Sequence, residues 1–340
     1  MKVVVLTTSY PRNPTDSAGR FIADSVDATR ALDIEAEVVS PATFRHFGLA
    51  YGGGIVQNIR RAPWKAGLLP AFLANYVRAA RGAARDADVV HAHWLPSAIP
   101  ALATRKPFVL QLWGTDVELA RRSPVLWRPL LRSASAVVAA SEALAEAGRA
   151  LGAPEVQVIP AGVAVPDLMR TPDEPPHVLY VGRLSPEKGI LQFLEATEGI
   201  PRVIIGDGPL REQVAETRGF VSADEVAEAY ARAAVVCVPS LREGYGMTAR
   251  EGMAHGRAVV ASRVGGLPEA IRDGETGLLV PPGDPRALRA AIERLIADRS
   301  LRERLGAAAR VEAHVRFSPQ AEAEALVKLW RTVSLYRPAR

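Results

Sequence analysis

The chain has 340 residues, of which 48% are hydrophobic and 23% are charged, and its formal net charge is +5. This length and apolar content suit two globular domains, each with its own core. A single cysteine, Cys237, excludes an intrachain disulfide, and the lack of an apolar run of about 18 residues excludes a membrane-spanning helix.

The N-terminal residues form the first predicted strand. The apolar run within residues 1–9 is too short for the hydrophobic part of a signal peptide, and Pro11 follows almost at once. Together with the single cysteine, which favours a reducing compartment, this predicts a cytoplasmic protein.

Strand-like apolar runs alternate with helical stretches along the whole chain. In the first half the expected strands are 3–7, 37–40, 88–93, 108–113, 136–140 and 156–160. In the second half they are 177–181, 202–205, 235–239, 258–262 and 278–280. Strands separated by helices predict parallel sheets covered on both faces, so the expected fold class is α/β with two Rossmann-like, doubly wound lobes.

A proline-rich segment separates the two halves. Five prolines fall within residues 160–176, which therefore cannot form a regular helix. The predicted domains are a first lobe over 1–162, a linker over 163–176 and a second lobe over 177–318. A last helix over about 319–335, which Ser318 can cap, is expected to pack back onto the first lobe.

The first lobe holds the whole excess of positive charge. Residues 1–165 contain 18 Lys and Arg against 13 Asp and Glu, whereas residues 166–340 contain 24 of each. Within 60–85, six basic residues alternate with Trp64 and other large apolar residues, a pattern typical of helices that rest on an anionic membrane. An ordinary helix packed on the sheet, with a solvated basic face, explains the same pattern.

In open parallel sheets, ligands bind at the carboxyl ends of the strands. In the second lobe, Arg183 follows a strand, and Ser185 with Pro186 can open a helix that has Lys188 in its first turn. A helix N-terminus beside two cations predicts a diphosphate site. The alternative is a surface turn with two solvated cations.

The next two strand ends also carry candidate ligand groups. Gly206 and its neighbours allow a backbone to approach a ligand closely, although a tight turn would need the same glycines. Glu243 follows a strand, and Glu251 lies on the helix after it. Carboxylates suit sugar and ribose hydroxyls, and the turn at Gly246 aims the first amides of that helix toward phosphate. As part of a solvated helix face, both glutamates would be unremarkable.

Taken together, Arg183 with Lys188, Glu243 with Glu251, and the stretches 265–269 and 273–280 resemble family-4 glycosyltransferases. The resemblance is specific over about 177–283 and weaker elsewhere. It implies the GT-B fold, in which two Rossmann-like lobes face each other across a cleft. It also implies retaining transfer of a sugar from a nucleotide-diphosphate sugar, as co-substrate, to an acceptor hydroxyl, with no metal and no other cofactor.

The resemblance implies roles for the motif residues of the second lobe. Arg183 and Lys188 would neutralise the donor diphosphate, and Glu243 would contact the donor sugar; these three form the expected catalytic set. The nucleotide ribose would be held by Glu251, and the base would stack near Phe220. The remaining donor contacts would come from the backbone at Gly206, Gly246 and Met247.

In the first lobe, the loop 11–20 with Gly19 would close over the donor phosphate and border the acceptor. His91 and His93 share one face of a strand and are candidates for acceptor contact, although core packing suits at least one of them equally well. Trp113 stands where many family members have a histidine that contacts the donor sugar, which leaves the hexose open. Asp116 is a candidate for approaching the acceptor hydroxyl.

Other classes of protein fit less well. A dinucleotide-dependent oxidoreductase needs Gly-x-Gly-x-x-Gly after the first strand, and residues 8–13 lack it. A non-catalytic two-lobe binding protein for sugar nucleotides would normally be exported. Asp86 and Asp88 resemble a metal-binding pair but precede their strand, on the wrong side for a ligand.

These observations predict the partners of the protein. We expect a nucleotide-sugar donor and an acceptor that is either lipid-linked or a small molecule, and we expect no nucleic acid. We expect the protein to be cytoplasmic. Alternatively, the first lobe binds peripherally to the inner face of the membrane. The base, the sugar, the acceptor and the oligomeric state stay open.

Overall fold

The computed structural model describes residues 1–13, 16, 19–51 and 54–335. The chain divides into two compact units. Unit 1 comprises Met1–Gly162 and the C-terminal segment that begins at Pro319, and unit 2 comprises Val163–Ser318. The chain therefore passes from one unit to the other twice, after Gly162 and after Ser318.

Unit 1 contains a six-stranded sheet in which all neighbouring strands are parallel. The strands are β1 (Lys2–Leu6), β2 (Glu35–Val39), β3 (Val89–His93), β4 (Phe108–Leu112), β5 (Ala136–Ala139) and β6 (Val156–Val158). Their order is β2-β1-β3-β4-β5-β6. The direction of winding reverses between β1 and β3, and at such a switch point the loops diverge and leave room for a ligand.

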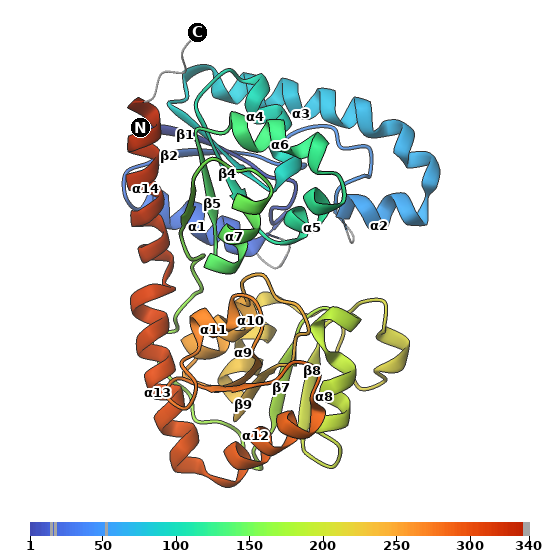
Figure 1. Ribbon diagram of the computed structural model, residues 1–340, viewed down its shortest axis with the longest axis vertical. Helices are drawn as coiled ribbons and strands as arrows, with labels where there is room; N and C mark the ends of the chain where they lie inside the picture. Colours follow the sequence, from blue (N-terminus) through green and yellow to red (C-terminus); the bar gives the residue numbers. More distant parts are fainter. Residues whose placement is uncertain (14–15, 17–18, 52–53, 336–340) are drawn as a thin grey trace. The chain divides into compact units, whose positions relative to one another are not determined.

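Helices cover the sheet of unit 1. They are α1 (Arg20–Arg30), α2 (Gly54–Arg61), η1 (Pro63–Leu68), α3 (Leu69–Ala83), η2 (Ala84–Asp86), η3 (Leu95–Ser97), α4 (Ala98–Ala103), α5 (Thr115–Arg122), α6 (Pro124–Ser133), α7 (Glu142–Ala150) and α14 (Pro319–Leu335). α1 and α14 lie side by side on one face (Figure 1). There Trp330 of α14 joins Ile22 of α1 and Val5 of β1 in one core.

Unit 2 contains a five-stranded parallel sheet in the order β11-β10-β9-β7-β8. The strands are β7 (Val178–Val181), β8 (Arg202–Ile205), β9 (Val235–Val238), β10 (Ala258–Ser262) and β11 (Leu278–Val280). The winding reverses between β7 and β9, so the switch point of this unit lies at their carboxyl ends. The α/β class with two doubly wound parallel sheets, predicted from the alternation of apolar runs, is confirmed.

Both faces of the second sheet are buried. The helices are η4 (Pro186–Lys188), α8 (Ile190–Ala196), η5 (Arg211–Gln213), α9 (Ala223–Arg232), α10 (Met247–Ala254), α11 (Leu267–Ala270), α12 (Pro285–Ala297) and α13 (Arg299–Arg316). On β9, Val236 and Val238 face one core, to which α9, α10 and α13 contribute. The alternate residues, Val235 and Cys237, face the other core, with α8 and α12. This is why the strand reads as an uninterrupted apolar run.

The segment expected as a linker has neither helix nor strand before β7. It packs on unit 2: Val163 is buried in one of that unit's cores, and Asp173 forms an ion pair of 2.9 Å with Arg232. Val163 also donates its backbone N–H to the carbonyl of Phe317 at 2.7 Å. The segment where the chain enters unit 2 and the segment where it leaves are thus joined by a hydrogen bond.

Candidate active site

A hollow lies at the switch point of unit 2. Its lining comes from the end of β7, the end of β9, and the turn and helix that follow each of them. The lining residues are Tyr180, Val181, Gly182, Lys188, Cys237, Val238, Pro239, Ser240, Glu243 and Thr248. Two of the predicted catalytic residues, Lys188 and Glu243, therefore share one concave site.

Lys188 and Glu243 are bound to each other. The Lys188 Nζ donates to Glu243 Oε2 at 2.7 Å, and the Ser240 hydroxyl donates to the same oxygen at 3.1 Å. The Lys188 side chain is 33% exposed and that of Glu243 is 11% exposed. The sequence assigned these two charges to different parts of a ligand, and the structure adds that each neutralises the other here.

The turn that presents Lys188 differs from the expected helix start. Ser185 and Pro186 open a single 3-10 turn that ends at Lys188, and Gly189 then adopts a left-handed conformation before α8 begins. The helix that Ser185 and Pro186 were expected to open around Lys188 is therefore present, but it is a single 3-10 turn that does not continue into α8. The physical reason is Gly189, whose φ of 69° breaks the helical path.

Arg183 follows the end of β7 and is exposed. Its backbone carbonyl accepts a hydrogen bond of 3.0 Å from the Tyr180 hydroxyl, which holds the start of the loop. Within the described ranges, nothing pairs with its guanidinium group. Arg183 thus supplies a positive charge that is available to a ligand next to the hollow.

The end of β8 passes very close to the end of β7. A Cβ on Gly206 would lie 1.8 Å from the carbonyl oxygen of Gly182, and the φ of Gly206 is +144°. Only glycine fits here. The Gly206 N–H donates to the carbonyl of Gly219 at 3.0 Å. Phe220, which follows Gly219, is 81% exposed.

The N-terminus of α10 opens beside the hollow. Gly246 is its left-handed N-cap and Met247 its first residue. Thr248 ties this turn to the sheet, because its hydroxyl donates to the carbonyl of Val181 at 3.1 Å. An N-terminus held in this way presents free amide N–H groups and a positive partial charge at the ligand side of the sheet.

Glu251 lies one turn further along α10. The hydroxyl of Tyr230, on α9, donates to Glu251 Oε2 at 2.6 Å. Burial, reinforced by the charge of Glu251, raises the pKa of Tyr230 well above 10, so the phenol stays a donor. The sequence did not indicate Tyr230 as a site residue. It lies among the regularly spaced apolar residues of an amphipathic helix, and this position predicts only a core residue.

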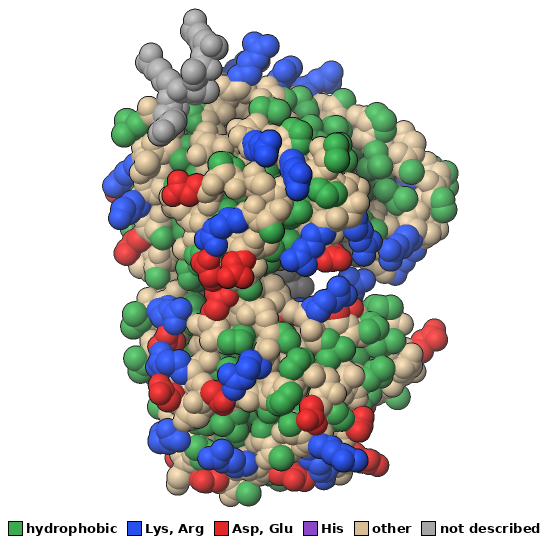
Figure 2. Space-filling view, viewed as in Figure 1, with side chains coloured by type: hydrophobic (Ala, Val, Ile, Leu, Met, Phe, Trp, Pro, Cys, Tyr) green, Lys and Arg blue, Asp and Glu red, His purple; other side chains and the backbone are tan. Residues whose placement is uncertain are grey.

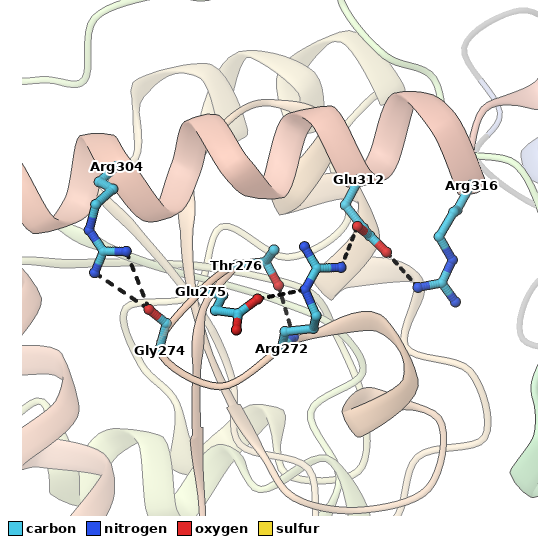
Figure 3. Close-up of polar contacts among 7 residues, drawn as sticks. All are labelled: Arg272, Gly274, Glu275, Thr276, Arg304, Glu312 and Arg316. Atoms are coloured by element: carbon cyan, nitrogen blue, oxygen red, sulfur yellow. Dashed lines mark hydrogen bonds and ion pairs between the residues drawn. The ribbon is translucent and has the colours of Figure 1, made fainter.

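The stretch 273–280, part of the family resemblance, is held against α13 (Figure 3). Arg272 bonds Glu275 at 2.9 Å and Glu312 at 2.5 Å, and Glu312 also bonds Arg316 at 2.5 Å. The two guanidinium groups outweigh partial burial and lower the pKa of Glu312. These polar groups fasten the loop before β11 to a helix, so this motif has a structural task.

The two histidines of β3, His91 and His93, are buried. His91 is 1% and His93 3% exposed, their rings stack at 4.5 Å, and Trp330 meets His91 edge-on at 5.5 Å. Burial lowers the pKa of His91 from 6.5 to about 3, and burial followed by the proximity of His91 lowers the pKa of His93 well below 6.5. Both imidazoles are therefore neutral and belong to the core of the unit.

Trp113 and Asp116 follow β4. The indole N–H of Trp113, which is half-buried, donates to His93 Nδ1 at 3.2 Å. Asp116 is 3% exposed, and its carboxylate accepts backbone N–H groups of Trp113, Gly114, Val117 and Leu95 at 2.9–3.3 Å. Burial raises its pKa in spite of these bonds. Asp116 thus organises the ends of β3 and β4 from within.

Gly19 lies at the switch point of unit 1. It is the left-handed N-cap of α1, and a Cβ there would lie 2.3 Å from the carbonyl oxygen of Ser9. The chain at residue 19 must therefore pass directly over the loop that follows β1. Residues 14, 15, 17 and 18 of the predicted phosphate loop lie outside the described residues.

Among the described residues, no helix is long and apolar enough to cross a membrane. In the same ranges, no three side chains of His, Cys, Asp or Glu gather as a set of metal ligands.

Two family models match the chain. The model described as Glycosyltransferase Family 4 matches residues 18–165, and the model described as Glycosyl transferases group 1 matches residues 175–298. One model thus falls on each unit. The chain belongs to the family-4, or group 1, glycosyltransferases, and the resemblance inferred from the motifs is confirmed.

Curated proteins match parts of the chain. It is 34% identical over 183 residues to the alpha-D-kanosaminyltransferase of Streptomyces kanamyceticus, and this match covers 48% of this chain and 47% of that protein. It is 45% identical over 107 residues to the D-inositol 3-phosphate glycosyltransferase of Corynebacterium diphtheriae, and this match covers 32% of this chain and 25% of that protein. The matches span about half or less of the length of these relatives.

Solved structures match the chain over nearly its whole length. The structure of Anabaena HepE in complex with UDP-glucose has a TM-score of 0.75 at 21% identity and covers 98% of this chain and 100% of its own. Sucrose-phosphate synthase from Thermosynechococcus elongatus has a TM-score of 0.78 at 22% identity and covers 98% of both chains. The fold is therefore GT-B, as predicted.

Proposed function

We propose that the protein is a retaining glycosyltransferase that moves a sugar from a UDP-sugar to an acceptor hydroxyl without a metal ion. The observation that carries the proposal is the composition of the unit 2 site: Lys188, Glu243 and the N-terminus of α10 lie together at the switch point. Cations and free amides suit a diphosphate, and carboxylates suit sugar hydroxyls. The choice of UDP rests on the likeness to HepE, whose structure contains UDP-glucose.

Each residue has a place in the proposed reaction. Arg183 and Lys188 bind the diphosphate and stabilise the negative charge that grows on it as the bond from sugar C1 to the phosphate oxygen breaks. The acceptor oxygen forms its bond to C1 on the face that UDP leaves, so the configuration is retained. The acceptor proton passes to the departing phosphate oxygen, and Glu243 holds the sugar.

Glu251 is the proposed ribose contact. Its Oε2 accepts a hydrogen bond from the Tyr230 hydroxyl at 2.6 Å, which fixes the direction of the carboxylate. A carboxylate can accept several hydrogen bonds at once, and we expect ribose hydroxyls to donate to this one. Phe220, with its exposed ring, is the proposed stacking partner of the base. Gly206, Gly246 and Met247 complete the proposed donor site through their backbone, and Gly19 is the proposed contribution of unit 1.

The test is a thermal-shift and donor-hydrolysis panel with UDP-, GDP-, ADP- and TDP-sugars, with and without EDTA. We expect UDP-sugars to stabilise the protein, with no effect of EDTA. Glu251→Ala should abolish the shift, whereas Glu275→Ala, which changes an exposed glutamate bound to Arg272, should leave it unchanged. Stabilisation by NAD(P), or by none of the nucleotides, would contradict the proposal.

The acceptor side of the proposal concerns α2 and η1 of unit 1. Val56 is 65% and Trp64 70% exposed, and Arg60, Arg61 and Lys65 lie beside them. Figure 2 shows apolar and basic side chains together over the part of unit 1 where Figure 1 places α2. Exposed apolar side chains flanked by cations suit an anionic membrane surface, so the proposed setting is the cytoplasmic face of a membrane, with a lipid-linked acceptor.

Sedimentation with liposomes tests the membrane contact. Vesicles rich in anionic lipid should carry the wild-type protein into the pellet at low salt, and neutral vesicles should not. Trp64→Ala combined with Lys65→Ala should weaken this binding, while Leu168→Ala, at an apolar residue of unit 2 that is 82% exposed, should not. A small-molecule acceptor is the conclusion if anionic vesicles leave the wild type in solution.

A further inference from the structure

Arg250 is a buried charge that the proposed reaction does not use. It lies on α10, four residues after the N-cap Gly246, and is 1% exposed. Removing a guanidinium group from water is costly unless the group is paired and fully hydrogen-bonded. Its partners therefore indicate what it does for the site beside it.

The guanidinium group is held by two carbonyls and two rings. Its Nη1 donates to the backbone oxygen of Tyr245, and its Nη2 donates to that of Gly266 at 3.4 Å. The group lies 3.6 Å from the centre of the Tyr245 ring and 4.6 Å from that of Phe317. Its Nε has no partner in the described part of the chain.

The positive charge of Arg250 is not neutralised by a carboxylate in direct contact with it. Burial lowers its pKa, the charges of Glu269 and Glu243 raise it from further away, and Arg316 lowers it. Among the described residues, no carboxylate lies within ion-pair distance of this guanidinium group. A cation that keeps its charge in a buried place exerts its field over a longer range than a solvated one.

The geometry places this charge behind the first turn of α10. A Cβ built on Gly246 would lie 3.5 Å from the Nη1 of Arg250 and 3.5 Å from the Cγ of Glu243. The guanidinium group therefore lies on one side of Gly246, next to the loop that carries the proposed sugar contact. Its charge adds to the partial positive charge of the helix N-terminus.

The hydrogen bond to the Tyr245 carbonyl also fixes the orientation of the peptide unit between Tyr245 and Gly246. The Tyr245 carbonyl and the Gly246 N–H belong to one planar trans peptide unit, in which they point opposite ways. Because Arg250 draws the carbonyl inward, the N–H of Gly246 is turned away from the core. In the described structure neither this N–H nor that of Met247 donates to another residue, so both are available to a ligand.

We propose that Arg250 is a positioning residue for the donor diphosphate: it turns the Gly246 peptide so that its N–H faces the ligand, and it places a buried positive charge behind that N–H. The inference rests on the proposed function and extends it. It also explains why a costly buried charge stands in the first turn of α10, where an apolar residue would pack more cheaply.

The test compares UDP with uridine, which has the same base and ribose but no phosphate. In Arg250→Met, calorimetry should show UDP binding weakened about tenfold, the loss expected for one hydrogen bond to a charged group and its field, while uridine binding stays as in the wild type. In steady-state transfer, the KM for the donor should rise with little change in kcat. Arg250→Lys, which keeps the charge but cannot bond both carbonyls, should lose about threefold in UDP affinity.

Arg257→Met is the matched control. Arg257 is also buried in unit 2, at 2% exposed, and donates to the backbone carbonyls of His255, Ala233 and Arg170, away from the hollow. We expect this variant to lower stability but to keep the ratio of UDP to uridine affinity.

The experiment distinguishes a failure of the inference about Arg250 from a failure of the proposed function. If the wild type binds UDP and Arg250→Met keeps its ratio of UDP to uridine affinity, the inference about Arg250 is overturned and the proposed function stands. If the wild type binds no UDP, the proposed function falls and takes the inference with it. Should Arg250→Met fail to fold, the Arg250→Lys variant decides by the same ratio.

Discussion

At the scale of single residues, the state of the donor site is set by the bond between Lys188 and Glu243. The ammonium that a diphosphate would need is occupied by a carboxylate of the same protein. Under the proposed function, a donor displaces Glu243 from Lys188, and the freed carboxylate then accepts hydrogen bonds from the sugar hydroxyls. Diphosphate binding by Lys188 and sugar binding by Glu243 would then follow one another at the same pair.

Glu243→Gln tests this exchange. The variant keeps the shape of the side chain but removes the competing charge, so we expect UDP to bind roughly threefold or more tightly, as measured by calorimetry. Transfer from the UDP-sugar should nevertheless slow, because a sugar contact is lost. The free energy of unfolding should change by less than about 1 kcal/mol, since the pair is partly exposed.

Ser240→Ala is the control for this variant. It removes the other donor to the same carboxylate oxygen but leaves the charge of Glu243, so UDP affinity should stay as in the wild type. Unchanged or weaker binding of UDP to Glu243→Gln would show that the pair does not compete with the phosphates.

At the scale of elements, α14 is attached to unit 1 by an apolar stripe and one buried acid. Glu322 is 3% exposed, and its Oε2 accepts the N–H of Gly162 at 2.9 Å, just before the chain enters unit 2. Burial raises its pKa from 4.5 to about 7, against the hydrogen bonds from Gly162 and Ser25, and the nearby charge of Asp24 raises it further. The helix therefore carries a carboxyl group that prefers to be neutral.

This preference predicts a pH dependence of stability. Because the folded protein holds the proton more tightly than the unfolded chain, the stabilising contribution is complete below pH 4.5 and is lost as the pH rises to about 7. The loss amounts to roughly 3 kcal/mol by the size of the shift. Glu322→Gln keeps an acceptor for Gly162 but cannot titrate.

Urea unfolding of both proteins at pH 5 and pH 8 measures the effect. Relative to Glu322→Gln, the wild type should be less stable at pH 8 than at pH 5, by up to the same roughly 3 kcal/mol. Comparing the two proteins at each pH cancels the other titrating groups. A difference that stays constant with pH would mean that Glu322 titrates normally.

At the scale of the whole molecule, the two units are unequal in how they are built. Unit 2 is one continuous segment with two cores of its own, and it contains the proposed donor site except for Gly19. Unit 1 is completed by α14, which supplies Leu326, Leu329 and Trp330 to its core. Its folding therefore depends on a segment that follows unit 2 in the chain.

Two fragments test this asymmetry. Residues 163–318 expressed alone should fold cooperatively and bind UDP with nearly the affinity of the full chain, but should catalyse no transfer. A chain that ends at residue 318 should keep UDP binding while unit 1 loses its structure, because an apolar sheet face is left open to water. Circular dichroism and calorimetry report both results, and a cooperative, fully folded chain 1–318 would contradict the second.

The sequence by itself determined the class of fold and indicated which residues of unit 2 lie at the ligand edge of its sheet. Parallel strands buried on both faces are apolar throughout, as β9 is, so periodicity and length identify them. Glycines and charges that follow such strands fall at the ligand edge for topological reasons. This is why Arg183, Gly206 and Glu251 are predicted as donor contacts, and these roles stay predictions. The two family models then matched the same two halves of the chain.

Only the tertiary structure decided which groups meet. Lys188 and Glu243 come from different loops, Tyr230 reaches Glu251 from another helix, and Trp330 of α14 closes over His91 of β3. A local pattern tells which way a side chain points, but not what a distant element brings to face it. Contacts, burial and the resulting shifts in pKa depend on that second element, and for this reason they emerge only when the chain is folded.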